Sequence, residues 1–381
     1  MALENLYEEA LRAARKATSL DRAGRSKEAV EHYLRAASLL IELSKRTSEP
    51  TLRRIYVERA EAYIARCEQI RERPEAVEAL EAISAPEELI KELPPELAGA
   101  VLIERPETSW EDVGGLSKAK KLLMEAVVWP LLKPELFKGP REPWRGILLF
   151  GPPGCGKTLL AKAVAGQCKA TFFNVSAATI MSKWLGESEK NVKLLFDAAR
   201  KAAPSVIFID EVDSLLSIRA AEEIGGERRV KTQFLVELDG LRSRPGENVV
   251  VMGATNRPWD LDPAMVRRFE RRIFVPLPDK EAREEIFKIH LRGVELGPDV
   301  DIAELAELTV GYTGSDIRLV CREAAMEPVR ELMGQGPPEG EVVLRPISKA
   351  DFVKALRKIK PIVRPSDMRR YLEWAERYGE M

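Results

Sequence analysis

One segment of the sequence combines residue types and spacing that suit the binding of a polyphosphate. Residues 151–158 read GPPGCGKT and follow the apolar run 146–150. Glycines let backbone N–H groups approach phosphate oxygens, and a helix that begins here adds partial positive charge. In this pattern Lys157 bridges the β- and γ-phosphates and the Thr158 hydroxyl ligates Mg²⁺. The alternative is a glycine turn that caps an ordinary helix. The predicted ATP and Mg²⁺ site is made by Pro153, Gly154, Cys155, Gly156, Lys157, Thr158 and Leu159.

Two adjacent carboxylates follow a second apolar run, residues 206–209. A buried strand that ends in two acidic groups is costly unless they face a cation or solvent. Asp210 is placed to hold Mg²⁺ through water, and Glu211 to orient and deprotonate the attacking water. Such a pair is weak evidence alone, but behind a phosphate loop it predicts a catalytic role.

Three further side chains could act on the γ-phosphate. Asn256 follows a third apolar run and can reach the phosphate or the water, although a turn asparagine that satisfies its own backbone is the alternative. Arg267 and Arg268 open the segment RRFERR. They form either a surface ion-pair cluster with Glu270 or a contact to a neighbouring subunit's γ-phosphate. Such an arginine is worth about 10³ to 10⁵ in rate.

Composition limits the classes of partner. The chain has 381 residues, with 60 Lys and Arg against 61 Asp and Glu. Because nucleic-acid and anionic-membrane binding require surplus positive charge, we expect no direct nucleic-acid contact, and membrane contact only through a partner. No run of about 18 apolar residues and no signal-peptide order is present, so we expect a cytoplasmic location. The four cysteines lie far apart, which predicts small buried residues and no zinc site or disulfide framework.

The periodicity of apolar residues divides the chain. Residues 1–73 contain three helical stretches that predict a small three-helix bundle. Residues 74–106 carry eight acidic residues against two basic ones and five prolines, which predicts a linker. In residues 107–278, short apolar runs alternate with helical segments and predict an α/β subdomain with a parallel sheet covered on both faces. Residues 279–381 predict a small helical subdomain, and residues 365–378 a final helix.

These motifs together resemble the AAA ATPase module of the meiotic clade. The resemblance also rests on WEDVGGL at 110–116, GATNRP at 253–258 and GYTGSD at 311–316. It implies a ring-forming, usually hexameric, ATP-driven remodeller. His290 is expected at the ribose, unless it is an ordinary helix-face histidine. The further nucleotide contacts that the resemblance implies are Asp112, Val113, Gly114, His290, Gly314 and Ser315.

The same resemblance gives a role to Lys183, Trp184 and Leu185. In related ATPases this loop lines a central pore, where a flat aromatic grips an extended polypeptide of any sequence. Ordinary core packing of Trp184 is the alternative, because tryptophan is usually mostly buried. Residues 222–229 would form a second tier of the pore.

The N-terminal bundle resembles a microtubule-interacting and trafficking (MIT) domain. Residues 21–33 and 61–68 carry its turn and helix signatures. A helical-repeat array has similar signatures, but no further copies follow at about 34 residues. Bundles of this kind bind short tail segments of partner proteins.

A bundle of this family joined to a meiotic-clade module resembles the ATPases that disassemble ESCRT-III filaments, including their archaeal cell-division counterpart. This implies ESCRT-III-like tails as partners and a homohexamer. Residues 335–346 are too short for the insertion of eukaryotic members, which favours the archaeal form. The alternative is microtubule severing or general protein unfolding by an ATPase of the same clade, although a basic linker would be expected for severing. A nucleotide-binding scaffold and a DNA helicase fit less well.

Overall fold

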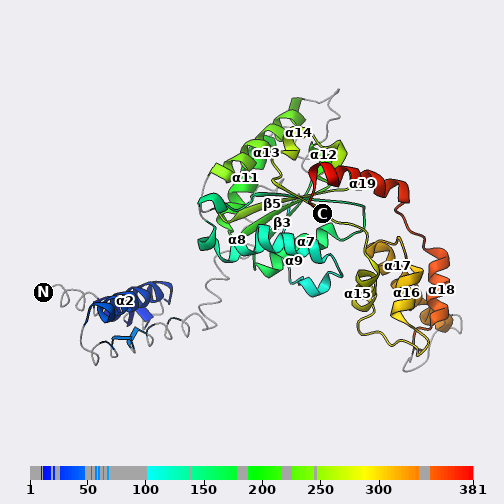
Figure 1. The fold of residues 1–381 in the computed structure, drawn as a ribbon, viewed down its shortest axis with the longest axis horizontal. Coiled ribbons are helices and arrows are strands. Elements are labelled where there is room, and N and C mark those ends of the chain that lie inside the picture. Colours follow the sequence, from blue (N-terminus) through cyan, green and yellow to red (C-terminus); the bar gives the residue numbers. More distant parts are fainter. Residues whose placement is uncertain are drawn as a thin grey trace. The chain divides into compact units, whose positions relative to one another are not determined.

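The computed structural model describes two units of the chain. Single residues and short stretches are described within 10–67, and residues 101–380 are described with gaps at 138, 178–187, 217–224, 244–246 and 334–343. The units are Met1–Ala85 and Pro86–Met381 (Figure 1). Among the described residues, no helix has the length and apolar character needed to cross a membrane.

The N-terminal unit is helical wherever its structure is described, apart from Thr47. Its longest element is α2 (Ser26–Arg46). Ala17, Tyr33 and Cys67 come from three successive helical stretches and share one buried cluster. The rings of Tyr33 and Tyr63 lie 5.6 Å apart. The described residues of this unit are thus helical and pack against one another through shared buried side chains, as a helical bundle requires.

A six-stranded sheet forms the centre of the second unit (Figure 1). Its strand order is β1-β3-β4-β5-β2-β6. All pairs are parallel except β1 with β3. Leu148 and Phe150 of β2 enter one core cluster, whereas Ile147 and Leu149 enter the other, because successive side chains of a strand alternate between faces. The strands are β1 (Val101–Glu104), β2 (Gly146–Phe150), β3 (Thr171–Ser176), β4 (Ser205–Asp210), β5 (Val249–Thr255) and β6 (Arg271–Phe274).

Strand β1 corrects the predicted linker. The linker was expected to continue to residue 106, but Val101–Glu104 pair with β3 at the edge of the sheet. Val101 and Ile103 are buried while Leu102 between them is exposed. This alternation is the pattern of a half-buried strand. The second unit thus begins before residue 107.

Helices cover both faces of the sheet, as buried parallel strands require. One core cluster joins the sheet to α7, η2, α8 and α9, and the other joins it to α11, α12, α13 and α14. Their bounds are α7 (Ser117–Leu123), η2 (Met124–Val128), α8 (Trp129–Leu132), α9 (Lys157–Gln167), α11 (Ser188–Lys201), α12 (Val212–Leu216), α13 (Gly225–Ser243) and α14 (Pro263–Val266). Short 3-10 turns are η1 (Trp110–Asp112), η3 (Pro134–Leu136), η4 (Gly139–Arg141) and η5 (Pro258–Asp260).

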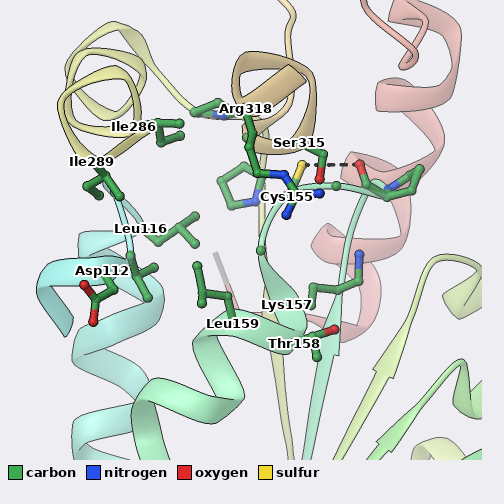
Figure 2. A pocket seen from close by; sticks show the side chains of 18 of the residues that line it. Asp112, Leu116, Cys155, Lys157, Thr158, Leu159, Ile286, Ile289, Ser315 and Arg318 are labelled. Carbon is green, nitrogen blue, oxygen red and sulfur yellow. Dashed lines mark hydrogen bonds between the residues drawn. The ribbon is translucent and has the colours of Figure 1, made fainter. Parts of the chain in front are cut away.

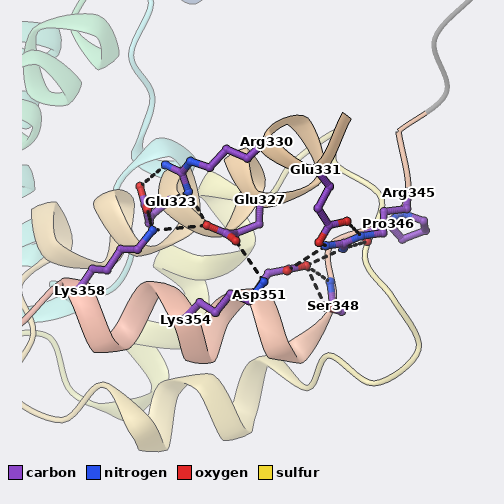
Figure 3. Close-up of polar contacts among 10 residues, drawn as sticks. All are labelled: Glu323, Glu327, Arg330, Glu331, Arg345, Pro346, Ser348, Asp351, Lys354 and Lys358. Atoms are coloured by element: carbon purple, nitrogen blue, oxygen red, sulfur yellow. Dashed lines mark hydrogen bonds and ion pairs between the residues drawn. The ribbon is translucent and has the colours of Figure 1, made fainter. Parts of the chain in front are cut away.

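The small helical subdomain packs four helices around a third core cluster. Ion pairs join the third of these helices to the fourth. Lys354 contacts Glu327 at 3.2 Å, and Arg345 bridges Glu331 and Asp351 at 2.7 Å each (Figure 3). Hydrogen bonding to Arg345 lowers the pKa of Asp351 to about 2. The helices are α15 (Lys280–His290), α16 (Ile302–Leu308), α17 (Gly314–Met333) and α18 (Lys349–Lys358).

The final helix, α19 (Pro365–Tyr378), packs on the large subdomain rather than on the small one. The Trp374 ring lies 4.5 Å from the Phe150 ring at the end of β2. Beyond the helix, Glu380 forms a parallel bridge with Ile273 of β6. Helix α19 therefore packs against the sheet that carries the phosphate loop, whereas the sequence pattern assigned it to the small subdomain at residues 279–381.

Candidate functional site

The phosphate loop connects the end of β2 to the start of α9, as the sequence predicted. Gly156 has φ of 89° and precedes the first helical residue, Lys157. Gly154 has φ of 76°, and a Cβ there would lie 2.8 Å from the Thr313 hydroxyl. Both positions need glycine, because the left-handed region penalises other residues. The loop also meets the small subdomain directly, since the Ser315 N–H donates to the Gly154 carbonyl at 3.0 Å.

Lys157 is buried at the base of this loop. Its amine donates to the carbonyls of Gly151 at 2.9 Å and Pro152 at 2.8 Å. Burial is the main cause that lowers the pKa of Lys157 to about 8. A buried ammonium that donates to neutral carbonyls is a strong attractor for phosphate oxygens.

The carboxyl end of β4 places its two acidic residues beside the loop. The Thr158 hydroxyl donates to Asp210 Oδ2 at 2.9 Å. A hydroxyl beside a carboxylate is an oxygen donor set that fits Mg²⁺, which usually completes its coordination with water and substrate phosphates. Glu211 is exposed and has φ of 51°, an uncommon conformation for this residue type that is typical of functional sites.

Asn256 follows β5 and lines the same site. Its side-chain Oδ1 is buried without a hydrogen-bond partner. Its backbone carbonyl accepts a hydrogen bond from the Tyr371 hydroxyl at 2.6 Å. In the turn-asparagine alternative, the Asn256 side chain would form a hydrogen bond with its own backbone. No described contact of Oδ1 is of this kind.

These residues line a cavity of about 560 Å³ between the large and small subdomains. Figure 2 shows apolar side chains, including Leu116, Ile286 and Ile289, at one end and Lys157 and Thr158 at the other. Such a cavity suits a flat apolar base joined to a charged phosphate chain. The predicted residues that line it are Asp112, Val113, Gly114, Pro153, Gly154, Cys155, Gly156, Lys157, Thr158, Leu159, Asp210, Glu211, Asn256, His290, Gly314 and Ser315.

Asp112 of the large subdomain and His290 of the small subdomain also line the cavity. Asp112 caps its own 3-10 turn through Ser109, which lowers the pKa of the carboxyl group. Arg292 approaches the same carboxylate at 3.4 Å. Burial, and then the charge of Arg318, lower the pKa of His290. A neutral imidazole can both donate and accept a hydrogen bond with a sugar hydroxyl.

The arginine segment divides into structural and outward positions. Arg271 contacts Glu380 at 2.9 Å, and Arg272 donates to backbone carbonyls, so both fasten the C-terminal segment. Arg268 contacts Asp239 at 3.2 Å. Neither Arg267 nor Arg268 lines the cavity of its own chain.

Glu270, the acidic residue of the ion-pair alternative, accepts hydrogen bonds from the backbone N–H groups of Arg145 at 2.7 Å and Gly146 at 3.4 Å. Lys183, Trp184 and Leu185 lie outside the described residues, as do residues 222–224 of the predicted second tier. All four cysteines are buried, as predicted, and Cys155 also lines the cavity.

Sequence reasoning missed several contributors to the site. Arg318 of α17 lines the cavity one turn beyond Ser315. Its spacing from the GYTGSD motif is the signal that could have found it. Ile286 and Ile289 of α15 are apolar residues of a helical pattern. From sequence alone, a ligand-binding role for them looks the same as ordinary core packing.

Comparison with protein families gives four matches. Residues 147–277 match the ATPase family associated with various cellular activities (AAA), and residues 299–337 match the AAA+ lid domain. Residues 7–72 match the MIT (microtubule interacting and transport) domain. Residues 325–379 match the Vps4 C terminal oligomerisation domain.

Curated relatives include p60 ATPase-containing subunits of katanin. Katanin p60 ATPase-containing subunit A1 from Arabidopsis thaliana is 48% identical over 293 residues, which are 73% of this chain and 56% of the katanin subunit. The A-like 1 form from Homo sapiens is 46% identical over 301 residues, or 76% of this chain and 61% of that protein. The chain thus spans 56% to 61% of the length of these relatives.

Solved structures agree with the fold. The FIGL-1 AAA domain in complex with ADP has a TM-score of 0.68 and 44% identity, covering 77% of this chain and 98% of that one. A structure titled "Structural Basis for Katanin Self-Assembly" has a TM-score of 0.61 and 38% identity, covering 74% and 95%.

Proposed function

Since the chain belongs to the AAA ATPases of the meiotic clade and carries an N-terminal MIT domain, we propose that it hydrolyses ATP to disassemble ESCRT-III-like filaments. The observation that carries the hydrolysis is the meeting of Lys157, Asp210 and Glu211 in one cavity. They come from the loop after β2 and from the carboxyl end of β4, which is separated from β2 by β5. Ligands bind at this edge of open α/β sheets.

Each side chain has a chemical task in this proposal. Lys157 leaves the loop carbonyls and pairs with the β- and γ-phosphate oxygens, whose charge favours its protonated form. Thr158 and Asp210 would hold Mg²⁺, which neutralises phosphate charge during the transfer. Glu211 accepts a proton from the attacking water, and the unpartnered Asn256 Oδ1 accepts a hydrogen bond from the same water.

Hydrolysis would depend on assembly. We expect a homohexamer in which Arg267 and Arg268 reach the γ-phosphate of the next protomer, since neither lines its own cavity. The match of residues 325–379 to an oligomerisation domain supports self-association. Self-assembly of katanin, the subject of one of the similar solved structures, supports the same property in a relative.

The N-terminal unit would capture the substrate. Leu34 and Ile41 lie seven residues apart on α2 and are 43% and 37% exposed. This spacing places them on one helix face, where an apolar segment of a partner's tail could pack. The captured chain would then pass Lys183, Trp184 and Leu185 in the central pore. Membrane scission or archaeal cell division is the setting we propose, in the cytoplasm and with membrane contact only through the partner.

Microtubule severing is the second candidate function. The identity to the katanin relatives and the match to the microtubule interacting and transport model favour it. The acidic composition of residues 74–106 opposes it, because microtubule surfaces are acidic.

One experiment separates the two candidates. The full chain with ATP is mixed with ESCRT-III-like filaments or with microtubules, and polymer loss is followed by light scattering. The Glu211→Gln variant is the matched control, because it should bind ATP without turnover. ATP-dependent loss of microtubules alone would overturn the ESCRT-III assignment. Absence of phosphate release under all conditions would overturn hydrolysis itself.

A further inference from the structure

A second cavity, of about 640 Å³, adjoins the nucleotide cavity and shares Pro153, Glu211 and Asn256 with it. Helix α19 contributes one of its walls through Asp367, Arg370 and Tyr371. The C-terminal helix therefore reaches a second side of Glu211 and Asn256, although no sequence motif links them.

Tyr371 is the point of contact. Its side chain is buried, and its hydroxyl donates to the Asn256 carbonyl at 2.6 Å. The Tyr371 ring also packs against Trp259 with centroids 5.0 Å apart. The Arg370 guanidinium stands 3.8 Å from the centroid of the Trp259 ring. The hydroxyl is thus fixed by packing before any nucleotide binds.

This hydrogen bond holds the backbone of Asn256, which also lines the nucleotide cavity. Residues 255–257 lie at the end of β5, where Thr255 donates to Asp213 at 2.7 Å and accepts from the Arg257 N–H at 2.9 Å. The carbonyl of Asn256 has Tyr371 as its described side-chain partner. Holding this carbonyl restrains the peptide plane that follows Asn256 and so limits the directions that its Cα–Cβ bond can take.

We propose that Tyr371 is a positioning residue for ATP hydrolysis, which holds Asn256 toward the γ-phosphate from the C-terminal helix. This inference rests on the proposed ATPase activity. Burial raises the pKa of Tyr371 to about 12, so its hydroxyl stays protonated and able to donate at physiological pH. The helix that anchors the end of the chain to the sheet thereby also sets the geometry of the reaction.

The test is Tyr371→Phe, which keeps the ring and removes the hydroxyl. We expect kcat for ATP to fall about 3- to 10-fold, as for the loss of one neutral hydrogen bond, while KM changes less than about twofold. Tyr378→Phe is the matched control, because it removes a hydroxyl from the same helix outside both cavities and should leave kcat unchanged. Light scattering checks that all variants assemble as the parent chain does.

A double-mutant cycle separates positioning from a structural role. If Tyr371 acts through Asn256, Tyr371→Phe has no further effect on kcat in the Asn256→Ala background. Additive losses, a changed KM with unchanged kcat, or a loss of assembly that accounts for the lost rate would overturn the proposal. An inactive parent chain would instead count against the ATPase function, so the two failures are distinguishable.

Discussion

Replacing Lys157 with Met should change the pH dependence of stability as well as nucleotide binding. In the nucleotide-free chain the Lys157 ammonium is buried against two carbonyls, and its pKa falls from 10.5 to about 8. At 1.36 kcal/mol per pH unit, this difference corresponds to about 3 kcal/mol against the folded state below pH 8. Lys157→Met removes this cost and so gains stability, but the lost hydrogen bonds to Gly151 and Pro152 offset about 1 to 3 kcal/mol of the gain.

The sign of the pH effect follows from proton binding. Between pH 8 and 10.5 the unfolded chain keeps the Lys157 proton while the folded chain has lost it, so stability rises with pH. Below pH 8 both states are protonated and the slope vanishes. Relative to Lys157→Met, the parent chain should therefore gain about 2 kcal/mol between pH 7 and 9.5, or roughly 4 to 8 °C in the transition of the large subdomain.

Thermal unfolding without nucleotide at several pH values measures this difference. Lys162→Met is the matched control, because Lys162 lies on the same helix in a partly exposed ion pair with Glu104. Its difference from the parent chain should stay constant with pH. A pH-independent difference for Lys157→Met as well would refute the assignment of the lowered pKa to burial. Added Mg²⁺ and ATP should raise the transition of the parent chain and not that of Lys157→Met.

Three further substitutions probe hydrolysis and its coupling to the substrate. Glu211→Gln should retain bound ATP and release phosphate at least about 100-fold more slowly, because it removes the general base; undiminished release would exclude that role. Arg268→Ala protomers should assemble yet hydrolyse at least about 1,000-fold more slowly, as measured by phosphate release alongside light scattering. Full activity would restrict Arg268 to a structural role within its own chain, where it contacts Asp239. Trp184→Ala should spare hydrolysis and abolish filament disassembly in a turbidity assay, and retained disassembly would contradict the pore assignment.

The phosphate loop and the strand ends could be predicted because their signal is local. Eight consecutive residues set the loop, and buried runs before Asp210 and Asn256 identify the parallel strands. Strand β1 was missed because its evidence is non-local: four residues behind an acidic, proline-containing segment gain their role only by pairing with β3. The sheet edge supplies that partner, and no nearby residue indicates it.

The placement of α19 shows the same limit at the level of packing. Its amphipathic pattern predicts that one face is buried, but it does not say which core receives that face. Trp374 meets Phe150 and Tyr371 meets Asn256 across more than 100 positions of sequence. Neither Tyr371 nor Arg318 belongs to a motif that predicts catalysis, so only the folded chain brings them to the site.

The charges around the cavity explain why hydrolysis should require a neighbour. Asp112, Asp210 and Glu211 face it together with Lys157 and Arg318, so the described lining carries one more negative charge than positive. ATP with one Mg²⁺ retains about two negative charges, and the transition state concentrates them on the γ-phosphate oxygens. The described residues of one chain therefore lack compensation at the place where charge develops. An arginine from the next protomer would supply it, and Arg267 and Arg268 lie outside their own cavity where they are able to serve another.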